Sequence, residues 1–321
     1  MTSAATVPPT PFLVRHGVPP GLRGLVAGIV GYSESCDRPV VRRQVAGTLI
    51  PLVLSSGPTL DVVGAAGEDG ARRYGSFVAG FMPNPVTTSF ETRQCCLQIY
   101  LTPIGAFRLL RRPGRELTAR VVDVDDVTRA FGQPVLEELW SARTWARRFD
   151  LIDRRLLTLS SSAPEPAPYV KWMWRRIQRT GGRARIDDLV RQTGWSHRHV
   201  IARFTEQIGV GPKLASRVVR FERAMSALRY HSAADVAAQL GFADQSHLVR
   251  EVRSFSGWAP GALKAAQPTT AYSAIGNHPG SVGSGSVDRR ERRSGAVARW
   301  DRPRGRGHWS GGVRWTEACT P

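Results

Sequence analysis

The sequence predicts an α+β protein, with a β-rich N-terminal domain that has trailing helices and an all-α C-terminal domain that holds two helix-turn-helix units. Three observations lead to this prediction. Short apolar runs separated by Gly, Pro and Ser fill residues 21–101, helical periodicity begins after Thr102, and a Pro/Ser/Ala-rich stretch at 160–168 separates the two halves. The chain has 321 residues, which is enough for two domains of ordinary size.

The N-terminal domain is predicted at residues 21–159, after a disordered N-terminus at 1–20. Its strands are indicated by runs rich in β-branched and aromatic residues between turn formers, namely QVAGTLIPLVLSSG, LDVVGAAG, GSFVAGFMPNP and CCLQIYLTP. Two later stretches, PIGAFRLLRR and PVLEELWSARTWARRFDLIDRRLLTL, keep apolar residues at helical spacing. We expect these helices to pack on the strands or on a second subunit.

The stretch SSSAPEPAP at 160–168 has no large apolar residues and is predicted to be an extended linker. The helical domain is then expected at 169–265, with Trp172 and Trp174 packing its first helix rather than stacking on bases. Residues 266–321 are Gly/Ser/Arg-rich and aperiodic, which predicts a disordered basic tail.

A formal net charge of +19 makes a polyanion the leading partner, with nucleic acid ahead of an acidic membrane surface. Residues 171–264 alone carry 17 Lys and Arg against 7 Asp and Glu. The chain shows no signal peptide and no apolar stretch of membrane-spanning length, so a cytoplasmic protein is expected. The four cysteines have no CxxC spacing, and we expect neither a metal site nor a cofactor.

The segment ADVAAQLGFADQSHLVREVRSFSG predicts the later helix-turn-helix unit. Gly241 permits the chain reversal between the helices, and Asp244 stands where the N-cap of the second helix belongs. IDDLVRQTGWSHRHVIARFTEQIG repeats this plan with Gly194 at the turn and Ser196 as N-cap. One such unit is common in helical proteins, whereas two with cationic outward faces are much less common by chance.

A long helix is predicted between the two units. Apolar residues recur there on one face, and Pro212 suits the first turn. About 18 residues at 1.5 Å each give roughly 27 Å. This length is close to the ~34 Å that separates successive major-groove faces on one side of B-DNA.

Residues from about 185 to 263 resemble the DNA-binding domain of the AraC/XylS family of bacterial transcription regulators. The match is carried in the second unit by Gly241-Phe242, Asp244, Ser246-His247, Arg250, Arg253, Gly257 and Pro260, and in the first by Gly194, Ser196, Arg198, Phe204, Gly209 and Pro212. More loosely, YGSFVAGFMPNP and LQIYLTPIGAFRLL are similar to the sensor-side domain of one branch of this family.

The resemblance implies a sequence-specific regulator that is not an enzyme and that places two recognition helices in successive major grooves of promoter DNA. It also implies that the N-terminal domain senses a small-molecule effector or forms a homodimer, and that RNA polymerase is a partner. The base-facing residues that it indicates are Arg198, Ile201, Ala202, Gln245, Ser246, Val249 and Arg250. Lys213, Arg217 and Arg253 are the candidates for phosphate contacts.

Two alternatives stay open at this point. A nucleoid-type protein would coat DNA without sequence preference through its charge and its Arg-rich tail. A thiol-based sensor or alkyl-transfer enzyme would use Cys95 or Cys96, although their apolar surroundings favour buried, inert thiols.

Overall fold

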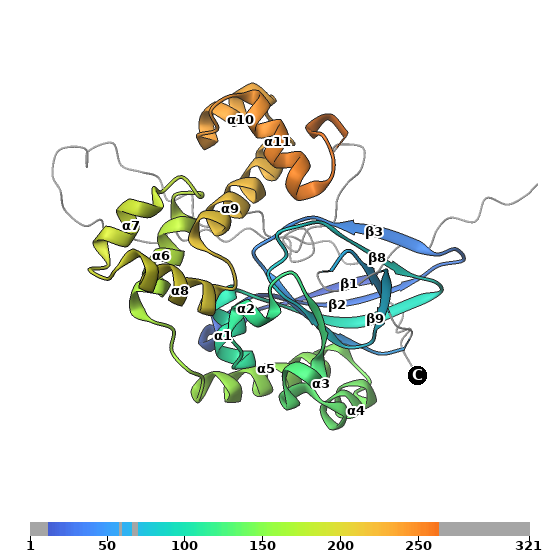
Figure 1. The fold of residues 1–321 in the computed structure, drawn as a ribbon. Coiled ribbons are helices and arrows are strands. Elements are labelled where there is room, and N and C mark those ends of the chain that lie inside the picture. The colour runs from blue at the N-terminus through green and yellow to red at the C-terminus, as the bar shows by residue number, and fades with distance from the viewer. Residues whose placement is uncertain (1–11, 58–59, 66–69, 263–321) are drawn as a thin grey trace, which may run out of the picture.

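The computed structural model describes residues 12–57, 60–65 and 70–262 and confirms the α+β prediction (Figure 1). Its N-terminal part forms two antiparallel sheets. The six-stranded sheet has the order β1-β2-β9-β4-β7-β10, and the four-stranded sheet has the order β3-β8-β5-β6. The strands are β1 (Phe12–His16), β2 (Val26–Ser35), β3 (Val40–Gln44), β4 (Ile50–Ser55), β5 (Leu60–Val63), β6 (Ala71–Tyr74), β7 (Phe77–Ala79), β8 (Val86–Phe90), β9 (Arg93–Leu101) and β10 (Val121–Asp123).

Helices follow the last long strand. Those of the N-terminal part are α1 (Pro103–Leu110), α2 (Gly114–Leu117), α3 (Val124–Val127), α4 (Gln133–Ser141) and α5 (Trp145–Ser161), with short 3-10 turns at Pro20–Leu22 and Arg129–Phe131. Those of the C-terminal part are α6 (Pro168–Arg179), α7 (Ile186–Gln192), α8 (His197–Ile208), α9 (Pro212–Ala227), α10 (Ala233–Leu240) and α11 (Gln245–Ser256).

The six-stranded sheet is buried on both faces because its central strands are apolar on both sides. In β4, Leu52 and Leu54 join the core under the helices, whereas Val53 between them packs against residues of the four-stranded sheet. This is the period-two alternation of a strand whose two faces are both covered. The helices therefore do pack on the strands, as expected.

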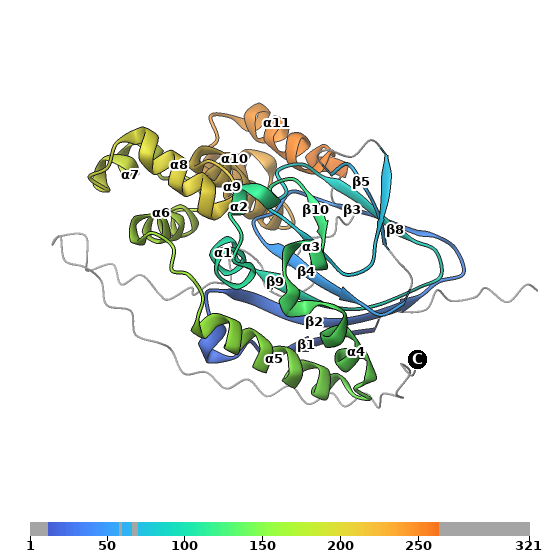
Figure 2. The same cartoon turned by 60° about the horizontal axis from the view of Figure 1, so that its bottom comes forward.

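Helix α5 runs along the outer side of the six-stranded sheet, next to β1 and β2 (Figure 2). Gly31 of β2 makes this approach possible, since a Cβ there would lie 2.5 Å from the ring of Trp145. Phe149 and Ile152 of the same helix are buried in the core. A glycine in a strand thus marks the close approach of another element.

The structure differs from the sequence prediction at two boundaries. Residues 12–16, predicted to be disordered, form β1, which pairs with β2 from Phe12 opposite Ser33 to His16 opposite Ile29. The apolar run of β1 is short and only becomes a strand because β2 offers it an open edge. The linker is shorter than 160–168, because α5 continues to Ser161 and α6 begins at Pro168. The predicted tail at 266–321 and residues 1–11 lie outside the described residues.

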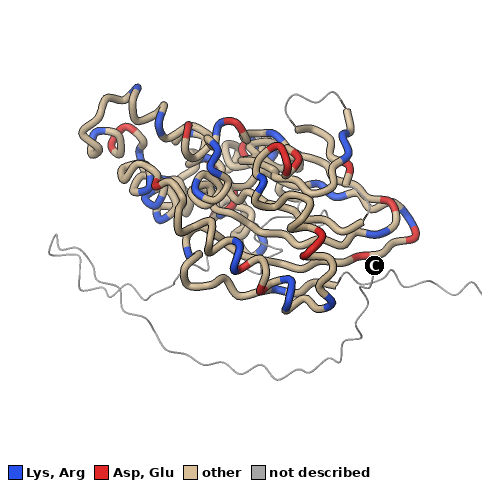
Figure 3. Tube along the Cα trace, turned by 90° about the horizontal axis from the view of Figure 1, so that it is seen from below, with Lys and Arg blue, Asp and Glu red and all other residues tan. Residues whose placement is uncertain are grey.

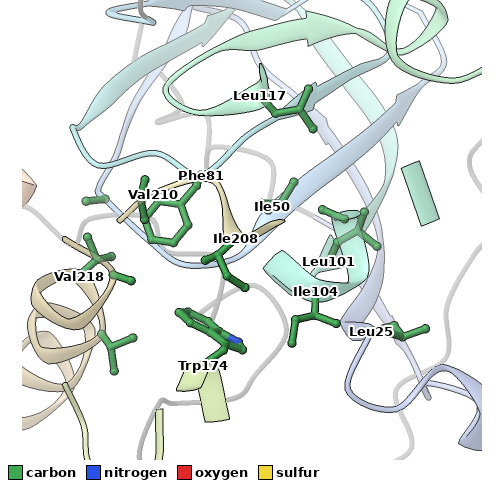
Figure 4. Packing of buried hydrophobic residues seen from close by; sticks show 14 of the residues in the cluster. Leu25, Ile50, Phe81, Leu101, Ile104, Leu117, Trp174, Ile208, Val210 and Val218 are labelled. Carbon is green, nitrogen blue, oxygen red and sulfur yellow. The ribbon is translucent and has the colours of Figure 1, made fainter. Parts of the chain in front are cut away.

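A single apolar core runs through both halves of the chain. Phe81 and Ile50 of the N-terminal part belong to the same cluster as Trp174, Ile208 and Val210 of the C-terminal part (Figure 4). The two domains therefore share buried surface rather than being connected by the linker alone. Among the helices that the structure describes, none has both the length and the apolar character needed to cross a bilayer.

Candidate nucleic-acid interface

The first helix-turn-helix unit consists of α7 and α8. Gly194 lies in the turn with φ of 75°, a left-handed conformation that strains residues with a Cβ. The Ser196 hydroxyl then caps α8 by accepting a hydrogen bond from the backbone N–H of His199, at 3.3 Å. Val200 and Phe204 are fully buried, so this helix is anchored by its inner face and turns its outer face to solvent.

The second unit consists of α10 and α11. Gly241 ends α10 with φ of 70°, and the Asp244 carboxylate accepts a hydrogen bond from the N–H of His247 at 2.6 Å. The His247 ring packs edge-on against Phe242 and accepts a hydrogen bond from the N–H of Ala243. His247 is thereby engaged in packing and hydrogen bonding at the turn.

Most of the predicted base-facing side chains lie on the solvent side of the two recognition helices. Arg198 and Ala202 of α8 are exposed, as are Gln245, Ser246 and Arg250 of α11, and Val249 is half-buried. Lys and Arg positions recur along this helical region (Figure 3). Both outer faces are therefore open to a ligand, and both are cationic.

Two of the residues predicted to contact DNA, Ile201 and Arg217, make contacts within the protein that the sequence did not indicate. Ile201 is half-buried and packs against the core, so it has less surface to offer to a base than its neighbours on α8. Arg217, predicted to contact phosphate, is paired through both Nε and Nη2 with the Glu251 carboxylate, at 3.1 and 2.7 Å. Only the tertiary structure brings these two charges together. The Arg217 side chain is still 44% exposed, so its contact with phosphate stays a prediction beside this pairing.

Helix α9 holds the second unit through two arginines on one side. Arg217 joins it to α11 through Glu251, and Arg220 donates to the carbonyl of Gly241 and lies 4.8 Å from the ring of Phe242. The hydrogen bonds to Glu251 raise the pKa of Arg217, whereas burial lowers that of Arg220. Through these contacts the long helix braces the second unit. Lys213 and Arg253, the other two phosphate candidates, are exposed.

Trp195 is a candidate contact residue that the sequence reasoning missed. Its side chain is 56% exposed, directly before the N-cap of α8, and it stacks on the His199 ring at 4.7 Å. Tyr169 of α6 hydrogen-bonds to the same histidine at 3.0 Å. A large exposed aromatic held in place at the entry of a recognition helix is unusual, but no signal in the local sequence distinguishes it from a buried tryptophan.

We predict that Asp244→Ala lowers the free energy of unfolding by about 1 kcal/mol, because the N–H of His247 loses its cap. Asp244→Ser keeps an acceptor at the same position and should recover most of the loss. Equilibrium denaturation of the three proteins checks this, and equal destabilisation by both substitutions would contradict the capping role.

The cysteine alternative is disfavoured by the surroundings of the thiols. Cys95 and Cys96 are buried in β9, and burial raises the pKa of Cys96 to about 12. A nucleophilic cysteine needs a thiolate at neutral pH and access for its substrate. Cys96 has neither property.

Residues 189–266 match the family model of a helix-turn-helix domain. The uncharacterized HTH-type transcriptional regulator YbfI of Bacillus subtilis is 34% identical over 94 residues. This match covers 29% of the present chain and spans about a third, 34%, of YbfI.

Two solved structures show a more distant likeness. ToxT of Vibrio cholerae is 11% identical, with 74% of this chain and 97% of that one covered and a TM-score of 0.44. The AraC-like transcriptional activator CuxR is 12% identical, with 65% and 93% covered and a TM-score of 0.22. The family match extends from within α7 to beyond the end of α11.

Proposed function

We propose, from the AraC-type helix-turn-helix domain that residues 189–266 carry, that this protein is a sequence-specific DNA-binding transcription regulator. The observation that carries the proposal is the pair of capped recognition helices, α8 and α11, whose outer faces are both exposed and cationic. A duplex with two half-sites on one side is the ligand that such a pair fits.

In the proposed mechanism, α8 and α11 enter successive major grooves. Helix α9 has 16 residues, or about 24 Å at 1.5 Å per residue, and spans the distance between the two units. Arg198, Ile201 and Ala202 would face bases in one groove, and Gln245, Ser246, Val249 and Arg250 in the other. Lys213, Arg217 and Arg253 would hold the register through phosphates, which carry no sequence information themselves.

The N-terminal domain has a regulatory role in this proposal. It would respond to a small-molecule effector or to dimerisation, and would alter the placement of the recognition helices or the contact with RNA polymerase. The apolar core that it shares with the C-terminal part supports such a coupling, because movement in one half cannot occur without repacking the other.

The test is in-vitro selection of DNA from a random pool with the full-length protein at near-physiological salt, where non-specific attraction is weakened. We expect a bipartite motif whose two blocks are centred about 10 base pairs apart, one turn of the duplex. A pool without enrichment, together with a steep salt dependence, would favour coating of DNA without sequence preference and would overturn the proposal.

A further inference from the structure

Besides the shared apolar core, three polar contacts connect the N-terminal domain to the DNA-binding region, and one of them is at the C-terminal end of α8. The Thr118 hydroxyl donates a hydrogen bond to the carbonyl of Gly209, the C-cap of α8, at 2.6 Å. The backbones approach so closely that a Cβ on Gly114 of α2 would lie 2.6 Å from the Gly209 nitrogen. The first recognition helix therefore cannot swing at this end without breaking contact with α2.

The second place is the far end of α11. The backbone N–H of Ala46 donates to the carbonyl of Phe255 at 2.9 Å. The Arg43 guanidinium lies 5.2 Å from the centre of the Trp258 ring, just beyond the helix. Both recognition helices are thus held at their C-terminal ends, which leaves the exposed residues near their N-termini facing outward.

The third place is Glu222, midway along α9, and it involves an ionisable group. Its carboxylate accepts hydrogen bonds from the backbone N–H of Thr48 at 2.7 Å and from the Thr48 hydroxyl at 3.0 and 3.1 Å. The side chain is only 8% exposed. Thr48 lies in the connection between β3 and β4, in the same short segment as Ala46.

Burying a carboxylic acid in the contact between the two domains carries a desolvation cost, which an apolar side chain at the same position would not carry. Burial raises the pKa of Glu222 to about 8, and the hydrogen bonds from Thr48 act in the opposite direction. The charged groups on the surrounding elements are engaged elsewhere, since Arg43 stacks on Trp258, Arg217 pairs with Glu251 and Arg223 donates to the carbonyl of Gln178.

Glu222 is well placed to transmit movement. It lies on the same helix as Arg217 and Arg220, which fix the second unit to α9. A shift of the segment 45–49 would therefore displace α9 and the second unit together, while Thr118 retains the first unit. The distance and angle between α8 and α11 would change as a result.

We propose that Glu222 and Thr48 are positioning residues, forming a latch through which the N-terminal domain sets the relative placement of the two recognition helices. This inference rests on the proposed function. A state of the N-terminal domain that moves the segment 45–49 opens the latch and relaxes the spacing of half-sites that the protein accepts.

Amide hydrogen exchange of the full-length protein tests the latch without DNA. Glu222→Ala removes both acceptors, and we expect exchange at Thr48 to rise by about tenfold or more, since its N–H loses its partner. At pH 5, Glu222→Gln keeps an acceptor and should stay near wild type, as should the exposed control Glu137→Ala. Thr48→Val is a second variant that tests the latch. It loses only the hydrogen bonds from the Thr48 hydroxyl to Glu222 and keeps the backbone N–H. Unchanged protection at residue 48 in Glu222→Ala would overturn the latch.

The pH profile distinguishes this latch from a merely structural contact. The pKa of Glu222 rises from 4.5 to about 8 on burial, so the closed contact is fully favoured below 4.5 and is weakened as pH rises toward 8. Glu222→Gln cannot ionise. Its exchange protection at residue 48 should therefore match that of wild type at pH 5 and exceed it at pH 9. If the ratio of the protection in wild type to that in Glu222→Gln stayed constant between these two pH values, the proposal would be contradicted.

Binding to the selected DNA site links the latch to function. Inserting one base pair between the two blocks moves them apart by about 3.4 Å and also rotates one relative to the other. Wild type and Glu222→Gln should lose more affinity on this insertion than Glu222→Ala, whose units are less restrained. Equal losses in all three proteins would overturn the positioning role. Failure of the selection to yield any site would overturn the proposed function and this role with it, whereas hydrogen exchange would still report the contact itself.

Discussion

Arg250→Ala should abolish most of the preference for the selected DNA site while leaving most of the background binding to random DNA. Arg250 is exposed on the outer face of α11, six residues beyond the N-cap Asp244, and within the described residues no hydrogen bond or ion pair engages its guanidinium. A guanidinium in the major groove can bridge O6 and N7 of guanine, a contact worth about 1–3 kcal/mol of discrimination. We therefore expect a loss of roughly 5- to 150-fold on the specific site.

Arg253→Ala is the matched control for this prediction, because it removes the same group from the same helix. Arg253 is exposed, lies in the last turn of α11, and is proposed to contact phosphate. Its loss should weaken specific and random DNA about equally and lower the slope of log K against log salt by about 1. Fluorescence anisotropy titrations at several salt concentrations measure both effects. Equal losses on both DNAs for Arg250→Ala would refute its base-reading role.

Trp174→Ala should destabilise the whole protein, with a loss of about 3–5 kcal/mol in the free energy of unfolding. Trp174 is among the largest fully buried side chains and lies in α6 beside Ile208, within the core that both domains share (Figure 4). Truncation would leave a cavity at the junction of α6, α8 and the N-terminal domain. With an entropy of unfolding of about 2.1 cal/mol/K per residue, a chain of 321 residues loses roughly 1.5 °C per kcal/mol, so the melting temperature should fall by about 4–8 °C.

Trp172→Ala is the control, since Trp172 lies two residues away on the same helix and is 37% exposed. We expect its cost to stay within about 1 kcal/mol, because little buried surface is lost. Thermal and urea denaturation of both variants checks the pair. A loss for Trp174→Ala no larger than for Trp172→Ala would mean that the core does not continue between the domains.

The strands and helices that the sequence predicts most reliably are those with a strong local pattern. The runs around β4, β5, β7 and β9 were recognisable because β-branched residues stand between turn formers, and α1, α4, α5 and the helices of the C-terminal part by their apolar period. The predicted runs do not include β1, β2, β3, β6, β8 and β10. Strands β1, β3, β6 and β8 are short, carry polar residues and pair with a neighbour, whereas β2 is ten residues long and largely apolar. Pairing is a non-local property that no window of sequence contains.

The site was predictable to the extent that it is local. Gly194 and Gly241, and the caps Ser196 and Asp244, are adjacent to the helices that they shape, so residue type and spacing indicate their roles directly. Trp172 and Trp174 mark the limit of such reasoning. Both were expected to pack α6, yet only Trp174 is buried, because the neighbouring elements cover one side of that helix.

The sequence by itself therefore determined the α+β class, the two helix-turn-helix units and the cationic outer faces of their recognition helices. Only the tertiary structure decided that Arg217 is paired with Glu251, that Ile201 is half-buried, and that Glu222 is held by Thr48, 174 residues away in the sequence. The physical reason is that caps, turns and periodicity act between neighbours in the chain. Ion pairs and buried acids depend on which distant surfaces the folded chain brings into contact.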